Sequence, residues 1–246
     1  MTSLGLVGVR GGCGVSSLTA GLGQALHGLG QRVLLVDRCP ENLLRLHGSL
    51  PFAERGGWAR ALFDRSSWGE ALWRLQPGFY LLPYGRLSDA ESARLERFLL
   101  ATPQFWRQRR AALAAQFDWL LFDLPQRLPG HAEHADLDLT LRIAEADAAC
   151  HVLLQDWRGE RERLLLNRFE PTRQLQRDLR LLWQQSFAAR LVPQCVHADE
   201  ALGAALAHKL PVGLHAPQSL AAQDLTSLAV WCLAERARLA PNGAPA

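Results

Sequence analysis

The sequence predicts an α/β protein, a doubly wound and mostly parallel sheet with helices on both faces. Three observations lead to this prediction. Six short, nearly continuous apolar runs suit parallel strands that are covered on both sides. Helical patterns lie between most of these runs, which is the order that a doubly wound sheet needs. A glycine-rich turn, RGGCGVSS, joins the first run to the first helix.

The same patterns assign the elements in order along the chain. We expect strands over residues 4–9, 32–37, 79–84, 118–125, 149–154 and 163–168. We expect helices over residues 17–29, 88–100, 103–116, 132–146, 173–188, 199–208 and 218–238. The first helix carries an apolar stripe and ends at Gly30, a good terminator. Ser88 and Glu91 have the spacing of a capping box at the start of the second.

Composition limits what the chain can be. Its 246 residues are 48% hydrophobic, enough for one sizeable core, and no linker or repeat divides them. We expect a single domain over 1–238 and a disordered tail over 239–246. No apolar run reaches the length of a membrane span, and a strand begins too early for a secretory signal, so we expect a cytoplasmic protein. Five cysteines without a CxxC pair indicate reduced thiols rather than disulfides or zinc.

Polar residues follow several of the predicted strands, at the edge where such sheets bind ligands. The glycine-rich turn follows the first strand, Asp37 the second, Asp123 the apolar run WLLF, and Asn167 the run LLL. Glycines let backbone amides approach phosphate oxygens, and the next helix adds its positive end. Ser16 stands where such loops place a hydroxyl on Mg²⁺, and Asp123 suits the hydrated metal.

The generic phosphate-loop pattern is nevertheless incomplete, because Val15 stands where its lysine belongs. Lys209 is the only lysine beside many arginines, a bias that would turn a lost lysine into arginine rather than valine. Position 15 therefore indicates a real loss of charge. By this pattern alone, nucleotide binding and a plain glycine-rich strand-to-helix turn both remain open.

The chain resembles the MinD/ParA family of P-loop ATPases, whose motif K-G-G-x-G-K-[ST] becomes RGGCGVS at residues 10–16. The segments VLLVDRCPENLLR, FDWLLFDLP and LLLNRF resemble the family's switch I, Walker B and adenine-reading segments, and the resemblance extends over about residues 3–238. Several segments are most similar to the MinD-like members found in bacterial cellulose-secretion systems. The resemblance implies ATP and Mg²⁺ as cofactors.

The resemblance assigns roles to the residues that match the motif. It implies nucleotide binding by Arg10, Gly11, Gly12, Cys13, Gly14, Val15, Ser16, Ser17 and Asn167, with Mg²⁺ held by Ser16 and Asp123. Arg10 matches the lysine that reaches across an ATP-bound dimer, and Asn167 the adenine-reading asparagine. Asp37 matches the first acid of switch I and is a candidate catalytic residue, or a cap of the next helix. The second acid is replaced by Cys39. With Val15, this departure implies weak or absent hydrolysis.

The leading hypothesis is a nucleotide-dependent switch that dimerises around ATP and supports assembly, localisation or regulation of cellulose synthase. The resemblance implies BcsR and other cellulose-secretion subunits as partners, with recruitment to the inner membrane or cell pole through them. The alternatives are a nucleotide-free scaffold and a DNA-segregation ATPase of the ParA type. The net charge of +3 does not by itself favour nucleic acid. An iron–sulfur reductase of this fold would need cluster cysteines at other positions, and no histidines have evident zinc spacing.

Overall fold

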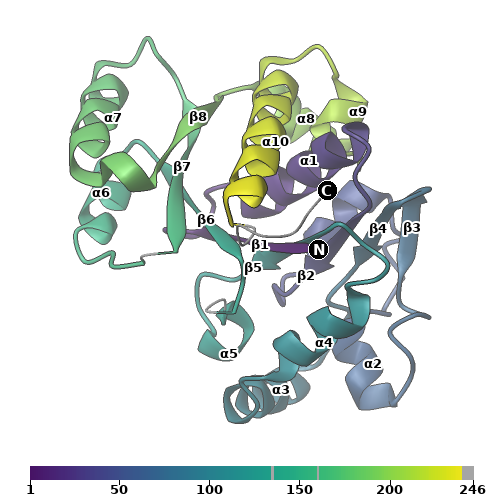
Figure 1. The fold of residues 1–246 in the computed structure, drawn as a ribbon. Coiled ribbons are helices and arrows are strands. Elements are labelled where there is room, and N and C mark those ends of the chain that lie inside the picture. The colour runs from purple at the N-terminus through teal and green to yellow at the C-terminus, as the bar shows by residue number, and fades with distance from the viewer. Residues whose placement is uncertain (134–135, 160, 240–246) are drawn as a thin grey trace.

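The computed structural model describes residues 1–133, 136–159 and 161–239. In this part of the chain one eight-stranded sheet has the order β3-β4-β2-β5-β1-β6-β7-β8 (Figure 1). Neighbouring strands are parallel except β3 and β4, which form an antiparallel edge. The strands are β1 (Thr2–Gly8), β2 (Val33–Asp37), β3 (Trp73–Gln76), β4 (Phe79–Leu82), β5 (Trp119–Leu124), β6 (Leu139–Glu145), β7 (Glu162–Phe169) and β8 (Leu191–His197).

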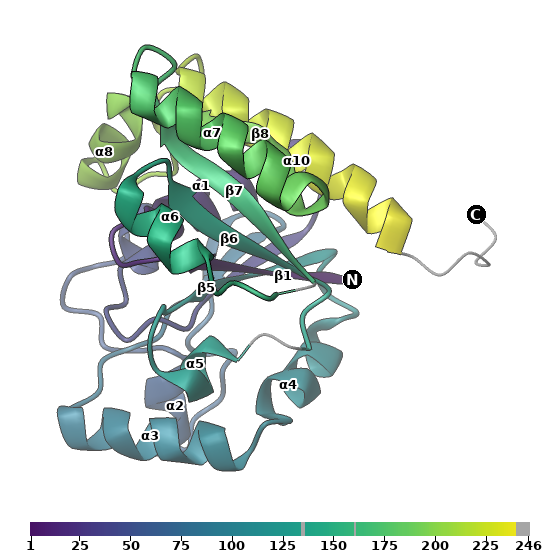
Figure 2. The same cartoon turned by 90° about the vertical axis from the view of Figure 1, so that its left-hand side faces the viewer.

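Helices cover both faces of the sheet, as Figures 1 and 2 show. They are α1 (Val15–Gly28), α2 (Trp58–Asp64), α3 (Asp89–Ala101), α4 (Phe105–Leu113), α5 (Pro129–Ala132), α6 (Ala148–Leu154), α7 (Gln174–Phe187), α8 (Glu200–Ala207), α9 (Val212–His215) and α10 (Leu220–Leu239), with 3₁₀ turns η1 (Leu44–Gly48) and η2 (Ala188–Arg190). The predicted fold class is therefore confirmed.

The two faces have separate cores because side chains alternate along each strand. On one face Leu35 and Leu121 pack in a cluster with residues of α1 and α10. On the other, Leu34 and Leu120 pack in a cluster with residues of α2, α3 and α4. Continuous apolar strands are thus explained by burial on both sides. Ser88 caps α3 in the predicted capping box with Glu91.

Two predicted elements are wrong. The helix expected over 132–146 is replaced by the short α5 and the strand β6, in which Leu139, Leu141 and Ile143 alternate with residues of the opposite face. The strand expected over 149–154 is helix α6, because the side chain of Asp147 accepts a hydrogen bond from the backbone N–H of Cys150 and caps a helix there. The strand that pairs with β1 on this side of the sheet is therefore β6, which precedes the segment predicted as a strand.

Some elements have no counterpart in the prediction. The edge strands β3 and β8 and helices α2 and α9 were not expected. The tail expected at 239–246 falls outside the described residues except for Leu239, which ends α10. Strand β8 lies beside β7 and is parallel to it. The strands that were not predicted therefore lengthen the sheet, which stays mostly parallel.

Candidate functional site

Residues 9–17, called the glycine loop here, join β1 to α1 at the carboxyl end of the central strand. Gly12 and Gly14 have φ angles of +83° and +86°, a region that favours glycine. In the described part of the chain, no backbone N–H group of residues 11–17 donates to a protein acceptor. Free amides at a helix N-terminus bind anions. The loop can therefore hold phosphate oxygens through its backbone.

The carbonyl groups of the glycine loop are held from the end of β7. Nδ2 of Asn167 donates to the carbonyl oxygen of Cys13 at 2.8 Å, and Nη1 of Arg168 donates to that of Gly12 at 3.0 Å. A Cβ atom on Gly14 would lie 2.8 Å from Nδ2 of Asn167, so this close approach requires glycine. These contacts fix the shape of the loop and leave its amides for a ligand.

Val15 supplies no charge to the loop. Its side chain is partly buried and packs against the main core. A Cβ atom on Gly8 would lie 3.4 Å from Cγ2 of Val15, so the valine lies over the end of β1. Arg10 is the only basic residue of the glycine loop. Within the glycine loop itself, only Arg10 can place a positively charged side chain near a bound phosphate.

Arg10 is engaged within its own subunit. Its Nη2 lies 2.8 Å from Oε2 of Glu145 and 2.7 Å from Oδ2 of Asp147, at the turn between β6 and α6. The hydrogen bond with Asp147 raises the pKa of Arg10 above its usual value and outweighs burial. Reaching another subunit would require Arg10 to leave both carboxylates.

Asp37 and Asp123 end neighbouring strands and are paired in the register of β2 and β5. Their exposed fractions are 0% and 1%. Burial, followed by the charge of Asp123, raises the pKa of Asp37 well above its usual value. Oδ1 of Asp37 accepts from the N–H of Cys39 at 2.9 Å, and Oδ2 from that of Leu44 at 3.1 Å. Asp37 therefore organises the segment that follows β2, as a capping role requires.

Asp123 has a free oxygen, in contrast to Asp37. Its Oδ2 is buried and has no hydrogen-bond partner among the described residues. Burial raises the pKa of Asp123 to about 7, while hydrogen bonding by the Ser16 side chain lowers it. A buried carboxylate oxygen without a partner is costly unless a ligand completes it. Ser16 and Asp123 are oxygen ligands of the kind that Mg²⁺ prefers.

Ser17 faces a buried histidine that the sequence analysis did not single out. Its hydroxyl lies 3.3 Å from Nε2 of His47, whose Nδ1 lies 3.2 Å from the carbonyl oxygen of Leu210. Burial lowers the pKa of His47. His47 therefore connects the first turn of α1 to η1 and to the segment between α8 and α9.

A buried polar network also escaped prediction. Arg38, directly after Asp37, is fully buried, stacks on Trp106 at 4.6 Å and donates to the carbonyl oxygen of Glu133 at 2.8 Å. Nε1 of Trp58 donates to the carbonyl oxygen of Asp37 at 2.6 Å. The only sequence signal for this network is that Arg38 directly follows Asp37, because the partners of Arg38 are 68 or more residues away in sequence. The network joins the end of β2 to α5.

A second part of this network contains His131. Nε2 of His131 lies 2.9 Å from the hydroxyl of Tyr84, and its Nδ1 bonds the carboxylate of Glu96. The backbone N–H of Gly130 donates to the other oxygen of Glu96 at 2.8 Å. These contacts fasten α5, which follows the Asp123 segment, onto α3. His131 is thus held by protein groups.

No group of three or more His, Cys, Asp or Glu that could hold a metal ion occurs in the described residues. His151 contacts Nε1 of Trp183 at 3.2 Å, and His134 lies outside the described residues. A metal ion at Ser16 and Asp123 would therefore depend on phosphate and water for its remaining ligands. All five cysteines are free thiols.

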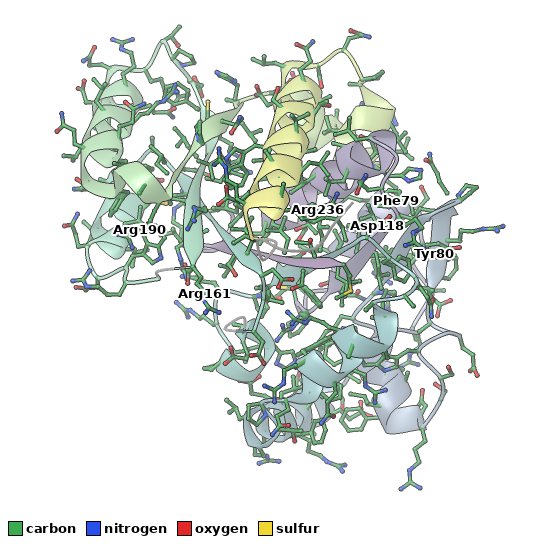
Figure 3. The ribbon with its side chains drawn as sticks, in the orientation of Figure 1. Phe79, Tyr80, Asp118, Arg161, Arg190 and Arg236 are labelled. Carbon is green, nitrogen blue, oxygen red and sulfur yellow. The ribbon has the colours of Figure 1, made fainter. Side chains whose placement is uncertain are left out.

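The amino ends of the strands have a different character. Arg32 pairs with Asp118 at 2.9 Å before β5, and the guanidinium of Arg236 from α10 lies 5.3 Å from the ring centre of Trp119. Asp118 and Arg236 are labelled in Figure 3. These contacts lie beside the first residues of β2 and β5.

Among the described helices, none combines the length and apolar character needed to cross a membrane.

Comparison with protein families gives a match over nearly the whole chain. The family model "Cellulose biosynthesis protein BcsQ" matches residues 1–233. The chain is 39% identical over 246 residues to cellulose biosynthesis protein BcsQ of Escherichia coli K12, covering 95% of this chain and 94% of that protein. It is also 39% identical over 245 residues to BcsQ of Salmonella typhi, with the same coverage.

Comparison with solved structures supports the fold. The septum site-determining protein MinD of Pyrococcus horikoshii, complexed with Mg-ADP, matches with a TM-score of 0.69 at 18% identity, over 98% of this chain and 99% of that one. The MinD cell division protein of Aquifex aeolicus matches with a TM-score of 0.72 at 18% identity, over 95% and 97% of the two chains. This chain therefore has the fold of the MinD-like P-loop ATPases.

Proposed function

The chain belongs to the BcsQ family of cellulose biosynthesis proteins, and we propose that it is an ATP-binding switch in cellulose synthesis. In this proposal two copies dimerise around ATP and Mg²⁺. The dimer supports the assembly, localisation or regulation of the cellulose synthase complex, and hydrolyses ATP weakly or not at all. The observation that carries the proposal is the set of free amides in the glycine loop, beside the unpartnered oxygen of Asp123.

The residues present fit a magnesium nucleotide. The backbone of residues 11–17 would hold the phosphates, and Ser16 with Asp123 would hold the hydrated metal. The metal would supply positive charge that Val15 does not. Asn167, whose Oδ1 is also buried without a partner among the described residues, would read the adenine.

Two positions support weak hydrolysis. Val15 leaves the phosphates without the lysine that stabilises charge in phosphoryl transfer, and losing one such donor costs about 100-fold or more in rate. Cys39 replaces a carboxylate of switch I, and Asp37 uses both oxygens on backbone amides. If Asp37 has a catalytic role, it acts from this fixed position.

Switching is supported by the contacts that join the two strand ends. Arg38 connects the segment after Asp37 to α5, and Glu96 with His131 connects α5 to α3. A phosphate or metal that moves Asp37 or Asp123 would therefore move surface helices as well. We propose that BcsR and other cellulose-secretion subunits recognise this change, in the cytoplasm and at the inner membrane or cell pole through those partners.

A nucleotide-free scaffold is the second candidate, and two observations favour it. Val15 is packed into the core side of the loop, and Arg10 is paired with Glu145 and Asp147 in its own subunit. In this alternative the loop is only a stable turn. Both candidates fit membership of the family and differ in whether a nucleotide binds.

The deciding experiment measures binding of ATPγS, ADP and GTP with Mg²⁺ by calorimetry, with light-scattering mass on the same samples. We expect selective ATPγS binding and a doubling of mass. The double variant Ser16→Ala, Asp123→Asn should lose the Mg²⁺-dependent part, while Ser66→Ala, an exposed serine elsewhere, should not. Absence of binding, with and without the purified partner proteins, would establish the scaffold.

A further inference from the structure

The turn that follows Asp37 carries an acidic residue that no part of the proposed site uses. The backbone N–H of Asn42 donates to the carbonyl oxygen of Cys39 at 2.9 Å and closes a turn over residues 39–42. The N–H of Cys39 donates to Asp37, so the turn begins at the buried carboxylate. Glu41 is in this turn and its side chain is exposed.

Asn42 holds the turn in place. It has a φ angle of +53° and an exposed fraction of 6%. Its Oδ1 accepts from the N–H of Tyr84 at 3.1 Å, and its Nδ2 donates to the carbonyl oxygen of Gly85 at 3.4 Å. Both partners lie after β4, the strand beside β2. The backbone of Glu41 is therefore fixed at the edge of the sheet where β2 and β5 end, beside Asp37 and Asp123.

The side chain of Glu41 is hydrogen-bonded to the first residue of the turn. The thiol of Cys39 donates to its Oε2 at 2.8 Å. Its other oxygen has no partner among the described residues, and none of their cations pairs with it. Cys39 thus has no carboxylate of its own, but its thiol donates a hydrogen bond to the carboxylate of Glu41, two residues further on.

The charge of Glu41 acts on two buried carboxylates. Burial raises the pKa of Asp37 and of Asp123, and the charge of Glu41 raises both further. Independently, Oδ2 of Asp123 is a buried carboxylate oxygen without a partner in the described residues. Repulsion among carboxylates and an unsatisfied buried oxygen are both relieved by a cation.

We propose that Glu41 supplies the switch I carboxylate that position 39 lacks, and that it binds the hydrated Mg²⁺ of the nucleotide together with Ser16 and Asp123. This inference rests on the proposed function, because it needs a magnesium nucleotide in the glycine loop. Mg²⁺ keeps several waters when it binds one or two carboxylates and phosphates, so an exposed glutamate can act through a water.

The test compares ATPγS affinity in saturating Mg²⁺ and in EDTA by calorimetry. Glu41→Gln keeps an acceptor for the Cys39 thiol but removes the charge. Its ratio of Mg²⁺ to EDTA affinity should fall about 3- to 10-fold, with no loss of affinity in EDTA. Glu70→Gln, the same change at another exposed glutamate, should keep the wild-type ratio. Adding Cys39→Asp to Glu41→Gln should restore it.

Thermal unfolding without nucleotide gives a second readout. Removing one of three repelling carboxylates should raise the melting temperature of Glu41→Gln, whereas a merely structural Glu41 would leave it unchanged or lower it. A wild-type affinity ratio in Glu41→Gln overturns the role of Glu41 and leaves the proposed function standing. Absence of ATPγS binding by the wild type overturns both.

Discussion

The side-chain amide of Asn167 donates a hydrogen bond of 2.8 Å to the carbonyl oxygen of Cys13. Its other polar atom, Oδ1, is buried and has no partner among the described residues. One residue at the end of β7 thus holds the glycine loop and keeps an acceptor available. Loop shape and nucleotide recognition are joined in this side chain if the proposed function is correct.

We expect Asn167→Ala to lower the free energy of unfolding by about 1–3 kcal/mol, because the carbonyl of Cys13 loses its buried donor. ATPγS affinity should fall as well. Asn167→Asp keeps Oδ1 but loses the donor, so it should share the loss of stability. Urea unfolding and calorimetry measure the two effects. An unchanged free energy of unfolding in both variants would show that this hydrogen bond does not stabilise the fold.

Releasing Arg10 should strengthen a nucleotide-bound dimer. Asp147→Asn removes one of the two charges that hold Arg10, yet its side-chain oxygen can still cap α6 through Cys150. If Arg10 reaches the phosphates of a second subunit, the dimer dissociation constant with ATPγS should fall about 3- to 10-fold. Sedimentation with and without nucleotide measures it. Asp156→Asn is the charge-matched control, and equal dimerisation in both variants would contradict this role.

Restoring the lysine should raise nucleotide affinity. Val15→Lys adds one charge-assisted contact to the phosphates, which is worth about 10-fold in the dissociation constant for ATPγS. If the chain hydrolyses ATP weakly, as proposed, the rate of hydrolysis should rise for the same reason. Val15→Ala controls for the lost packing against the core. Calorimetry and phosphate release give the values, and a lysine variant no tighter than the alanine variant would count against phosphate binding in the loop.

Stability should depend on pH through His131. Burial lowers the pKa of His131 below its ordinary value of about 6.5, although Glu96 opposes the change. A group whose pKa is lower in the folded chain contributes stability that is present above about pH 6.5 and lost as pH falls through the folded pKa. The difference in unfolding free energy between wild type and His131→Asn should therefore shrink below pH 6.5. A difference independent of pH would refute the linkage.

The strand ends could be predicted because parallel strands place their carboxyl ends along one edge of a sheet. Asp37, Asp123 and Asn167 each follow an apolar run, and the structure brings all three beside or near the glycine loop. Glycines at 12 and 14 have the positive φ that a tight phosphate loop uses. Residue type and place in the pattern were sufficient there.

The errors have local causes. Residues 137–143 alternate apolar and polar, a period of two, but the alanines and acids that flank them also suit a helix, and the prediction of a helix over 132–146 follows from those flanks. The apolar run at 149–154 is short, and only the Asp147 cap distinguishes a helix from a strand. Strand β8 contains Pro193 and Gln194, which weaken its signal.

Long-range polar contacts could not be predicted at all. Arg10 pairs with two acids that are 135 and 137 residues away, at the end of the strand that was predicted as a helix. Arg38 and His131 depend on side chains from helices whose relative placement no local pattern encodes. Each of these contacts follows from tertiary packing rather than from propensity or periodicity.

The position of β1 at the centre of the sheet has a consequence for synthesis of the chain. β1 pairs with β5 and β6, and the glycine loop is held by Asn167 and Arg168, so β1 and the loop are translated well before their partners. At ordinary ribosomal speed the interval is on the order of ten seconds, during which β1 is an uncovered apolar segment. A nascent or truncated chain that ends before β7 has the loop sequence without the contacts that shape it. Ligand recognition is therefore a property of the finished polypeptide, and chaperones are expected to meet the N-terminal strand before any nucleotide does.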